Sequence, residues 1–240
     1  MKKSERHRAK RDELVTVFER LSAYTETHVR EVGLVAAGVV IAVLSGLGLA
    51  SWLQNRNERS SFLLGELIQA YRAPLALSPE AQEAPAGVAT YANAGERDDK
   101  VIEIADDILA RYGSSKAAPK ALYYKALAFT GEKKYDDAIK TLNEFLRRYP
   151  GDFLAPLARF ALARAKEAQG NPAEALIQFQ ALADDSSGAF PREEGLLGMA
   201  RCQEAMGKKD EALKIYRRIL SDFPNSSYDS EARSKVDQLS

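Results

Sequence analysis

The chain has few of the residues that most often carry catalysis, metal binding and disulfide bonding. It contains one cysteine, Cys202, so no disulfide can form within the chain and cysteine usage does not indicate a redox compartment. Both histidines, His7 and His28, precede a long apolar segment, so the remainder lacks the commonest general base and metal ligand. The 34 Lys and Arg residues balance the 34 Asp and Glu residues, which leaves no net charge to attract nucleic acid.

Signatures of enzymes are also missing. The chain has no glycine-rich nucleotide-binding loop and no metal-ligand spacing. Three acidic pairs are expected at helix ends or on exposed helix faces, where solvated or dipole-compensating charges are commoner than catalytic acids. These pairs are Asp106-Asp107, Asp136-Asp137 and Asp184-Asp185. The sequence predicts a protein that is not an enzyme and has no cofactor and no metal site; an enzyme remains the alternative if a partner supplies the catalytic groups.

One charge-free run interrupts an otherwise charged sequence. Residues 32–55 contain no charged side chain, and the apolar part, residues 33–53, matches a hydrocarbon core of about 30 Å at about 1.5 Å per helical residue. Trp52, near the end of the run, suits a membrane interface. We expect a retained transmembrane helix over residues 33–53.

A cleaved signal peptide and a buried core helix are the alternatives to a membrane span. Small residues at Gly48 and Ala50 would allow cleavage before Ser51. Against cleavage, residues 1–32 carry six acidic groups, and the run exceeds the usual signal-peptide apolar region of about 7 to 15 residues. Against a core helix, the run has no polar face.

The residues before the span predict its orientation. This tail, residues 1–32, contains eight Lys and Arg residues, which favours a cytoplasmic N-terminus and a C-terminal domain across the membrane. Within the tail, residues 12–31 predict an amphipathic helix that lies on the inner membrane surface, contacts a cytoplasmic partner or extends the span.

Small residues recur every four positions within the span, at Gly38, Ala42, Gly46 and Ala50. We refer to these four positions as the small-residue stripe. Such a stripe would let a second transmembrane helix approach closely. The alternative is the ordinary abundance of glycine and alanine in membrane helices.

The C-terminal part of the chain repeats itself every 37 residues. Each copy predicts two helices, each with a small residue, at about 119–152, 156–189 and 193–226. The matching alanines are Ala126, Ala163 and Ala200 in the first helices and Ala138, Ala175 and Ala212 in the second, and Pro150 and Pro224 close the first and third copies. Because a helix pair cannot bury its own apolar face, we expect an all-α solenoid that ends in a capping helix at 228–240.

The segment between the span and the full copies, residues 54–97, contains a helix at 57–72 and then a proline-rich loop at 73–95. One repeat length before the first full copy, residues 99–115 predict another second helix. We expect residues 57–72 to be its first helix, with the loop inserted between them. The repeat domain then spans residues 98–240.

This pattern resembles the tetratricopeptide repeat family, which has a small residue in the first helix, an alanine in the second and a proline at the end. The resemblance covers residues 98–238 and departs from the family at a few positions. Ser187 replaces a final proline, the first helices have Leu122, Arg159 and Leu196 in place of tryptophan, and Gly131 lies two residues before the place of Gly170 and Gly207. Cys202 stands where Ala128 and Ala165 stand, which favours a small buried residue over a nucleophile.

The resemblance implies a binding groove on the surface of the first helices. Apolar residues beside arginines would suit an extended segment with a hydrophobic residue and a carboxylate. The alternative is that the arginines pair with glutamates three residues away and that the rows are ordinary solvated surface. The implied rows are Tyr123, Phe160 and Leu197, then Leu127, Arg164 and Arg201, then Thr130, Glu167 and Glu204, and Lys120 is also assigned to the groove.

The layout of a short tail, one span and a repeat domain is similar to that of the bacterial ancillary SecYEG translocon subunit family. That resemblance implies a single-pass protein of the bacterial inner membrane with a cytoplasmic N-terminus and a periplasmic repeat domain. The implied partners are the translocon and periplasmic chaperones. The alternative is a coordinator of cell-envelope assembly or division, similar to the repeat proteins associated with the Tol-Pal system. Both interpretations predict a scaffold that binds proteins or peptides and no nucleic acid.

Overall fold

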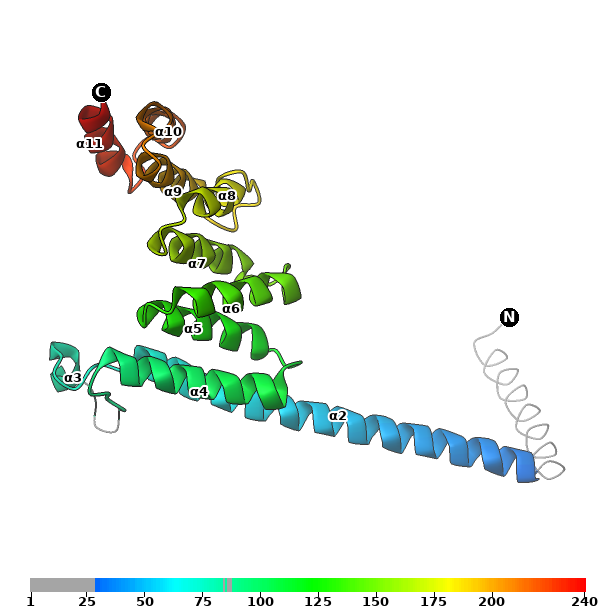
Figure 1. The fold of residues 1–240 in the computed structure, drawn as a ribbon. Coiled ribbons are helices and arrows are strands. Elements are labelled where there is room, and N and C mark those ends of the chain that lie inside the picture. Colours follow the sequence, from blue (N-terminus) through cyan, green and yellow to red (C-terminus); the bar gives the residue numbers. More distant parts are fainter. Residues whose placement is uncertain (1–28, 84, 86–87) are drawn as a thin grey trace, which may run out of the picture. The chain divides into compact units, whose positions relative to one another are not determined.

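The computed structural model describes residues 29–83, 85 and 88–240 (Figure 1). These residues are helical apart from turns, loops and an isolated β-bridge between Leu75 and Tyr91. The predicted all-α fold is confirmed. The chain divides into two compact units, Met1–Asn55 and Arg56–Ser240. Both histidines and most of the amphipathic helix predicted for residues 12–31 lie outside the described residues.

The long helix α2 (Val29–Arg72) contains the charge-free run. Its most apolar window has a mean hydropathy of 1.7 and is 0% buried, and the helix is long and apolar enough to cross a membrane. The core helix of a soluble domain would be mostly buried, so the exposure of this window does not support the core-helix alternative. A Cβ atom placed on Gly38 or Gly46 meets no other described atom within 4 Å, which leaves the small-residue stripe open to a packing partner.

The second unit is a stack of helix pairs. Each helix from α4 to α11 packs against the next one in the chain, and Figure 1 shows this succession from green to red. The helices are α4 (Ala94–Tyr112), α5 (Ala118–Gly131), α6 (Tyr135–Arg148), α7 (Ala155–Ala168), α8 (Pro172–Ala183), α9 (Arg192–Ala205), α10 (Lys209–Asp222) and α11 (Asp229–Leu239).

Small residues let the helices of the stack approach closely. All six alanines that mark the repeat are 0% exposed, and the large buried side chains Phe145, Phe179 and Tyr216 fill the space around them. In α9 a Cβ atom placed on Gly195 would lie 2.7 Å from the backbone nitrogen of Ala183. The crossing of α8 and α9 therefore requires a glycine at this position.

The turn inside each repeat contains a left-handed residue. Lys133, Gly170 and Gly207, which are 37 residues apart, have φ angles of 61°, 86° and 73°. The next backbone N–H donates to a carbonyl five residues earlier; in the first repeat Lys134 N donates to Phe129 O at 2.8 Å. This arrangement is a Schellman motif, which favours glycine at the left-handed position. Lys133 therefore adopts a conformation that is unfavourable for a residue with a side chain.

The unusual place of Gly131 has a separate cause. Gly131 ends α5, and a Cβ atom placed on it would collide with the carboxylate of Asp98 from α4. Asp98 is 2% exposed, and its Oδ1 accepts hydrogen bonds from Nε and Nη2 of Arg97, both at 3.1 Å. Gly131 thus makes room for a buried carboxylate at the contact between α4 and α5. The residue with the left-handed backbone conformation in this turn is Lys133.

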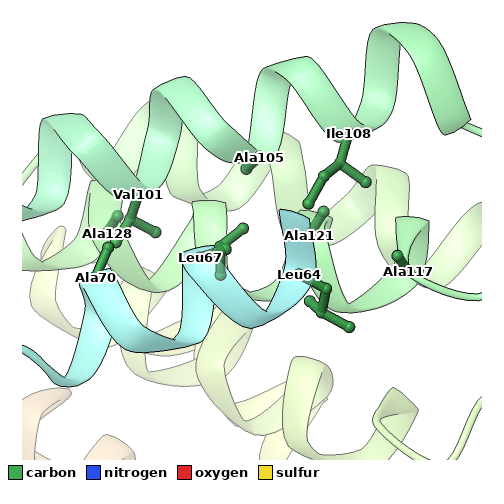
Figure 2. Packing of buried hydrophobic residues seen from close by; sticks show 9 residues of the cluster. All are labelled: Leu64, Leu67, Ala70, Val101, Ala105, Ile108, Ala117, Ala121 and Ala128. Atoms are coloured by element: carbon green, nitrogen blue, oxygen red, sulfur yellow. The ribbon is translucent and has the colours of Figure 1, made fainter. Parts of the chain in front are cut away.

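The C-terminal part of α2 pairs with α4. Leu67 is 0% exposed and lies with Val101 and Ile108 in one buried cluster (Figure 2). The proline-rich segment between these helices includes the short helix α3 (Pro79–Glu83). Ala76 N donates to Tyr91 O at 2.8 Å, which closes the base of this loop. The pair inferred from the repeat phase is therefore present, with the loop inserted between its helices.

Helix α11 covers the last helix pair. Ala232 is 0% exposed and packs in the same cluster as Tyr216. Lys235 Nζ donates to Glu204 Oε2 at 2.9 Å, and the Tyr216 hydroxyl donates to Glu204 Oε1 at 2.5 Å. Apolar and polar contacts together attach α11 to α9 and α10, as a capping helix of a solenoid requires.

Candidate protein-binding surface

Tyr123, the first residue of the implied apolar row, belongs to a cluster of tyrosines. Its ring centroid lies 5.8 Å from that of Tyr124, which lies 5.0 Å from that of Tyr71 at the end of α2. Burial raises the pKa values of the Tyr123 and Tyr71 hydroxyls above the ordinary value for tyrosine. Both hydroxyls are therefore neutral at physiological pH and are able to donate hydrogen bonds.

The other two members of this row differ in exposure. Phe160 on α7 is partly exposed, and its ring centroid lies 6.0 Å from that of Phe179 and 5.2 Å from that of Phe190. Leu197 on α9 is 3% exposed and belongs to the core of the last repeat. This differs from the expected accessible Leu197. The side chain is buried in a cluster that also contains Ala212 and Tyr216 of α10 and Ala232 of the capping helix α11.

Glu167 connects the two arginines of the second row. Arg164 Nη1 donates to Glu167 Oε2 at 2.7 Å, and Arg201 Nε donates to Glu167 Oε1 at 3.1 Å. The Arg201 guanidinium also lies 5.8 Å from the ring centroid of Phe179. Because the Arg164 side chain is 50% exposed and that of Arg201 is 27% exposed, a ligand carboxylate can reach Arg164 more easily.

The third row is engaged in internal contacts. Thr130 Oγ1 donates to Ala126 O at 2.9 Å within α5. Glu204, the expected alternative partner of Arg201, accepts hydrogen bonds from Tyr216 and Lys235 instead. The ion pair predicted at three-residue spacing therefore forms between Arg164 and Glu167 but not between Arg201 and Glu204. Arg201 instead pairs with Glu167, which lies on the preceding first helix, α7.

Two exposed apolar side chains near the implied rows were not among the groove residues predicted from the sequence. Leu157 is 39% exposed at the start of α7, and Phe153 just before it is 71% exposed. The Nζ of Lys120 lies 5.9 Å from the ring centroid of Phe153. Leu157 stands 37 residues after Lys120, so the repeat register alone would have found it.

Comparison with known proteins identifies the repeats. A tetratricopeptide repeat family model matches residues 120–152 and 194–226. The chain carries tetratricopeptide repeats. The matched segments coincide with the first and third copies, which both end in a proline. The resemblance inferred from the spacing of small residues is confirmed for these two tetratricopeptide repeats.

Solved structures of other tetratricopeptide-like repeats resemble this chain. Two crystal structures, both described as Podosopora anserina kinesin light chain with nearly identical TPR-like repeats, are each 15% identical to it. They cover 60% of this chain and 85% and 86% of their own chains, with TM-scores of 0.48 and 0.47. No curated protein sequence matches the chain.

Cys202 occupies an alanine position of the third tetratricopeptide repeat and is 0% exposed. Burial, followed by the negative charge of Glu167, raises the pKa of its thiol to about 11. The thiol is therefore neutral at physiological pH and acts as a small core residue. Within the part of the chain that the structure describes, no group of three or more His, Cys, Asp or Glu side chains is arranged to hold a metal ion.

Proposed function

We propose that this protein is a membrane-anchored, non-enzymatic scaffold that binds an extended segment of another protein along its first helices. The observation that carries the proposal is the partly exposed apolar surface of α5 and α7, next to the charged pair of Arg164 and Glu167. This surface consists of Tyr123, Leu127, Leu157 and Phe160. Apolar anchors with a nearby charge are suited to holding a peptide in one direction.

Apolar contacts would supply most of the binding energy, at about 25 cal/mol per Å² of apolar surface removed from water. Glu167 already pairs with both arginines, so a ligand carboxylate exchanges one ionic contact for another and gains little. We expect ligands with an aromatic or aliphatic anchor and a modest preference for a carboxylate near Arg164.

The proposed setting is the periplasmic side of a bacterial inner membrane, with α2 as a retained anchor and the N-terminal tail in the cytoplasm. The basic tail and the length of the charge-free run support this orientation. Anchoring would raise the effective concentration of the binding surface near a membrane complex. The proposed partners are the Sec translocon and periplasmic chaperones; coordination of the cell envelope with Tol-Pal-associated proteins is the second candidate.

Site-specific crosslinking in cells tests this function. A photoreactive amino acid would replace Phe160 on the binding surface or Gly46 in the small-residue stripe, and crosslinked partners would be identified by mass spectrometry. Ile177 on α8, which is 63% exposed, provides a control position on a second helix. Translocon subunits or chaperones recovered at Phe160 and not at Ile177 would support the proposal. Recovery of Tol-type or peptidoglycan-binding partners would favour the second candidate, and identical partners at Phe160 and Ile177 would refute the binding surface.

Protease digestion of spheroplasts tests the orientation separately. External protease should degrade the repeat domain and leave a short protected fragment that contains the span. Protection of residues 98–240 until the membrane is permeabilised would show that the domain lies in the cytoplasm. Cleavage of the chain after Ala50 in mature protein, detected by N-terminal sequencing, would establish a signal peptide in place of the anchor.

A further inference from the structure

In the first repeat, the end of α6 is fastened to the turn that follows α4. Arg148 Nη2 donates to the carbonyl oxygen of Gly113 at 3.1 Å, and the Tyr149 hydroxyl donates to the same oxygen at 3.3 Å. The guanidinium of Arg148 lies 5.2 Å from the centroid of the Tyr149 ring, which packs 5.8 Å from that of Phe145. We call the contact of Arg148 and Tyr149 with Gly113 the basic–aromatic brace.

The second repeat has lost the residues of this brace. The residues 37 positions after Arg148 and Tyr149 are Asp185 and Ser186. The residue 37 positions after Gly113 is Pro150. Helix α8 ends at Ala183, before the position that corresponds to Arg148. An acid and a small polar residue therefore stand where the first repeat has a base and an aromatic ring.

Asp185 makes a local contact in place of the brace. Its Oδ1 accepts a hydrogen bond from Ser187 N at 2.9 Å, and its Oδ2 accepts one from Ser187 Oγ at 2.9 Å. These hydrogen bonds lower the pKa of the Asp185 carboxyl, so the group stays ionised at physiological pH. The segment turns away through Gly188, which has a φ of 77°.

A cleft of about 780 Å³ lies where the brace is missing, between the turn before α7 and the turn after α8. Pro150, Phe153 and Pro156 contribute apolar walls, and Asp152, Asp184 and Asp185 contribute carboxylates. The cleft also contains Arg159, whose Nη1 donates to Gln178 Oε1 at 3.0 Å. The three carboxylates still outnumber the Arg159 guanidinium and the Lys120 ammonium beside Phe153, so the cleft has an excess of negative charge.

We infer that this cleft binds an extended segment of another protein in which a basic residue is followed by an aromatic residue. The segment supplies in trans the two side chains that Arg148 and Tyr149 supply in the first repeat. Its basic group lies among the carboxylates of Asp184 and Asp185, and its ring packs on Pro150 and Phe153. This second site is separate from the proposed surface of the first helices.

Charge and shape both favour this occupant. A guanidinium forms its strongest contacts with carboxylates, and Asp152, Asp184 and Asp185 all line the cleft. The volume of the cleft is in the range of pockets that hold small ligands or a few residues of a peptide. Another copy of this chain is not the expected occupant, because its Arg148 and Tyr149 are held at Gly113 and the pairs Arg111-Tyr112 and Arg159-Phe160 lie within helices, not in an extended segment.

Peptide binding to the full chain in detergent micelles tests the inference. The probe is a fluorescein-labelled peptide with the sequence of residues 146–152, Leu-Arg-Arg-Tyr-Pro-Gly-Asp, and the control peptide has Ala-Asp-Ser in place of Arg-Arg-Tyr. Fluorescence anisotropy should show at least roughly tenfold weaker binding of the control peptide, because that peptide lacks both the basic groups and the aromatic ring. Equal binding of the two peptides would overturn the inference.

Two variants test the location of the site. Asp184→Lys should weaken binding of the probe roughly tenfold, whereas Asp210→Lys, the same charge change at the start of α10, should leave it unchanged. The triple variant Asp185→Arg, Ser186→Tyr and Ser187→Pro restores the residues of the first repeat, so it should fill the cleft, abolish probe binding and raise the melting temperature. Retained binding by the triple variant with a raised melting temperature would show that the probe binds elsewhere.

A variant on the first helices separates this site from the proposed function. Phe160→Ala removes an apolar anchor of the first-helix surface, and probe binding should remain unchanged. If Phe160→Ala abolishes probe binding while Asp184→Lys has no effect, the probe occupies the first-helix surface and the inference about the cleft is wrong. If the probe does not bind in the cleft, the crosslinking test of the first-helix surface is still valid.

Discussion

Glu167 on α7 and Arg201 on α9 form an ion pair between two consecutive first helices, with a distance of 3.1 Å between Oε1 and Nε. The other oxygen of Glu167 accepts a hydrogen bond from Arg164 on its own helix. One carboxylate therefore compensates two guanidinium groups on the surface that we propose for ligand binding. Its removal should expose their positive charge to a ligand.

Glu167→Gln should strengthen the binding of acidic peptides severalfold, because Arg164 and Arg201 lose their shared carboxylate. A labelled Gly-Phe-Glu-Glu peptide and fluorescence anisotropy would measure the change. Glu174→Gln is the control, since it also removes one carboxylate, in this case the partner of Lys166, from α8. An equal gain in both variants would indicate an effect of net charge alone.

Lys133→Gly should raise the free energy of unfolding by about 1 kcal/mol, because the left-handed conformation of Lys133 disfavours any residue with a Cβ atom. Chemical denaturation would measure the gain. Lys133→Ala retains the unfavourable φ and should give no comparable gain. Gly170→Ala at the equivalent turn should lower the free energy of unfolding by a similar amount. An unchanged free energy in Gly170→Ala would contradict the explanation by backbone conformation.

Gly198→Ala should destabilise the repeat domain by about 1 to 3 kcal/mol, because the added methyl group would collide with the ring of Phe179. Thermal unfolding followed by circular dichroism would measure the loss. Gly151→Ala, where the added Cβ meets no described atom within 4 Å, serves as the control. Phe179→Leu combined with Gly198→Ala should recover part of the loss if the collision is the cause.

The Cys202 thiol should react with a disulfide reagent at pH 8 only after unfolding, because it is buried and its pKa is raised to about 11. The unfolded chain releases this proton at lower pH than the folded chain does. The free energy of unfolding should therefore fall as pH rises above the ordinary thiol pKa of about 8.5. Cys202→Ala should lack this part of the pH dependence, and fast labelling of the folded protein would contradict the burial.

Gly46→Leu should leave membrane insertion intact and weaken association of the span with a partner helix, because a large side chain prevents close approach. Crosslinking yield and detergent-resistant complexes would measure the association. Val40→Leu, which lies outside the small-residue stripe, is the control. Unchanged association in Gly46→Leu would mean that the stripe reflects ordinary membrane-helix composition.

Some features of the binding surface were visible in the sequence and others were not. The 37-residue register placed Tyr123, Leu127, Phe160 and Arg164 on first helices, where the structure has them with partly exposed or exposed side chains. The same register gave no indication that Leu197 would be buried. Exposure depends on which side chains of neighbouring helices pack against a residue, and Leu197 lies in the cluster that α9 forms with α10 and α11 at the end of the stack.

The class of the fold follows from the sequence, because the spacing of small and apolar residues specifies which faces of each helix are buried and repeats with every pair. The sequence also shows that a charge-free segment long enough for a membrane precedes the repeats. The sharing of Glu167 by Arg164 and Arg201 and the cleft beside Asp184 became visible in the three-dimensional structure. Those features depend on distances between side chains of different helices, which a linear pattern does not contain.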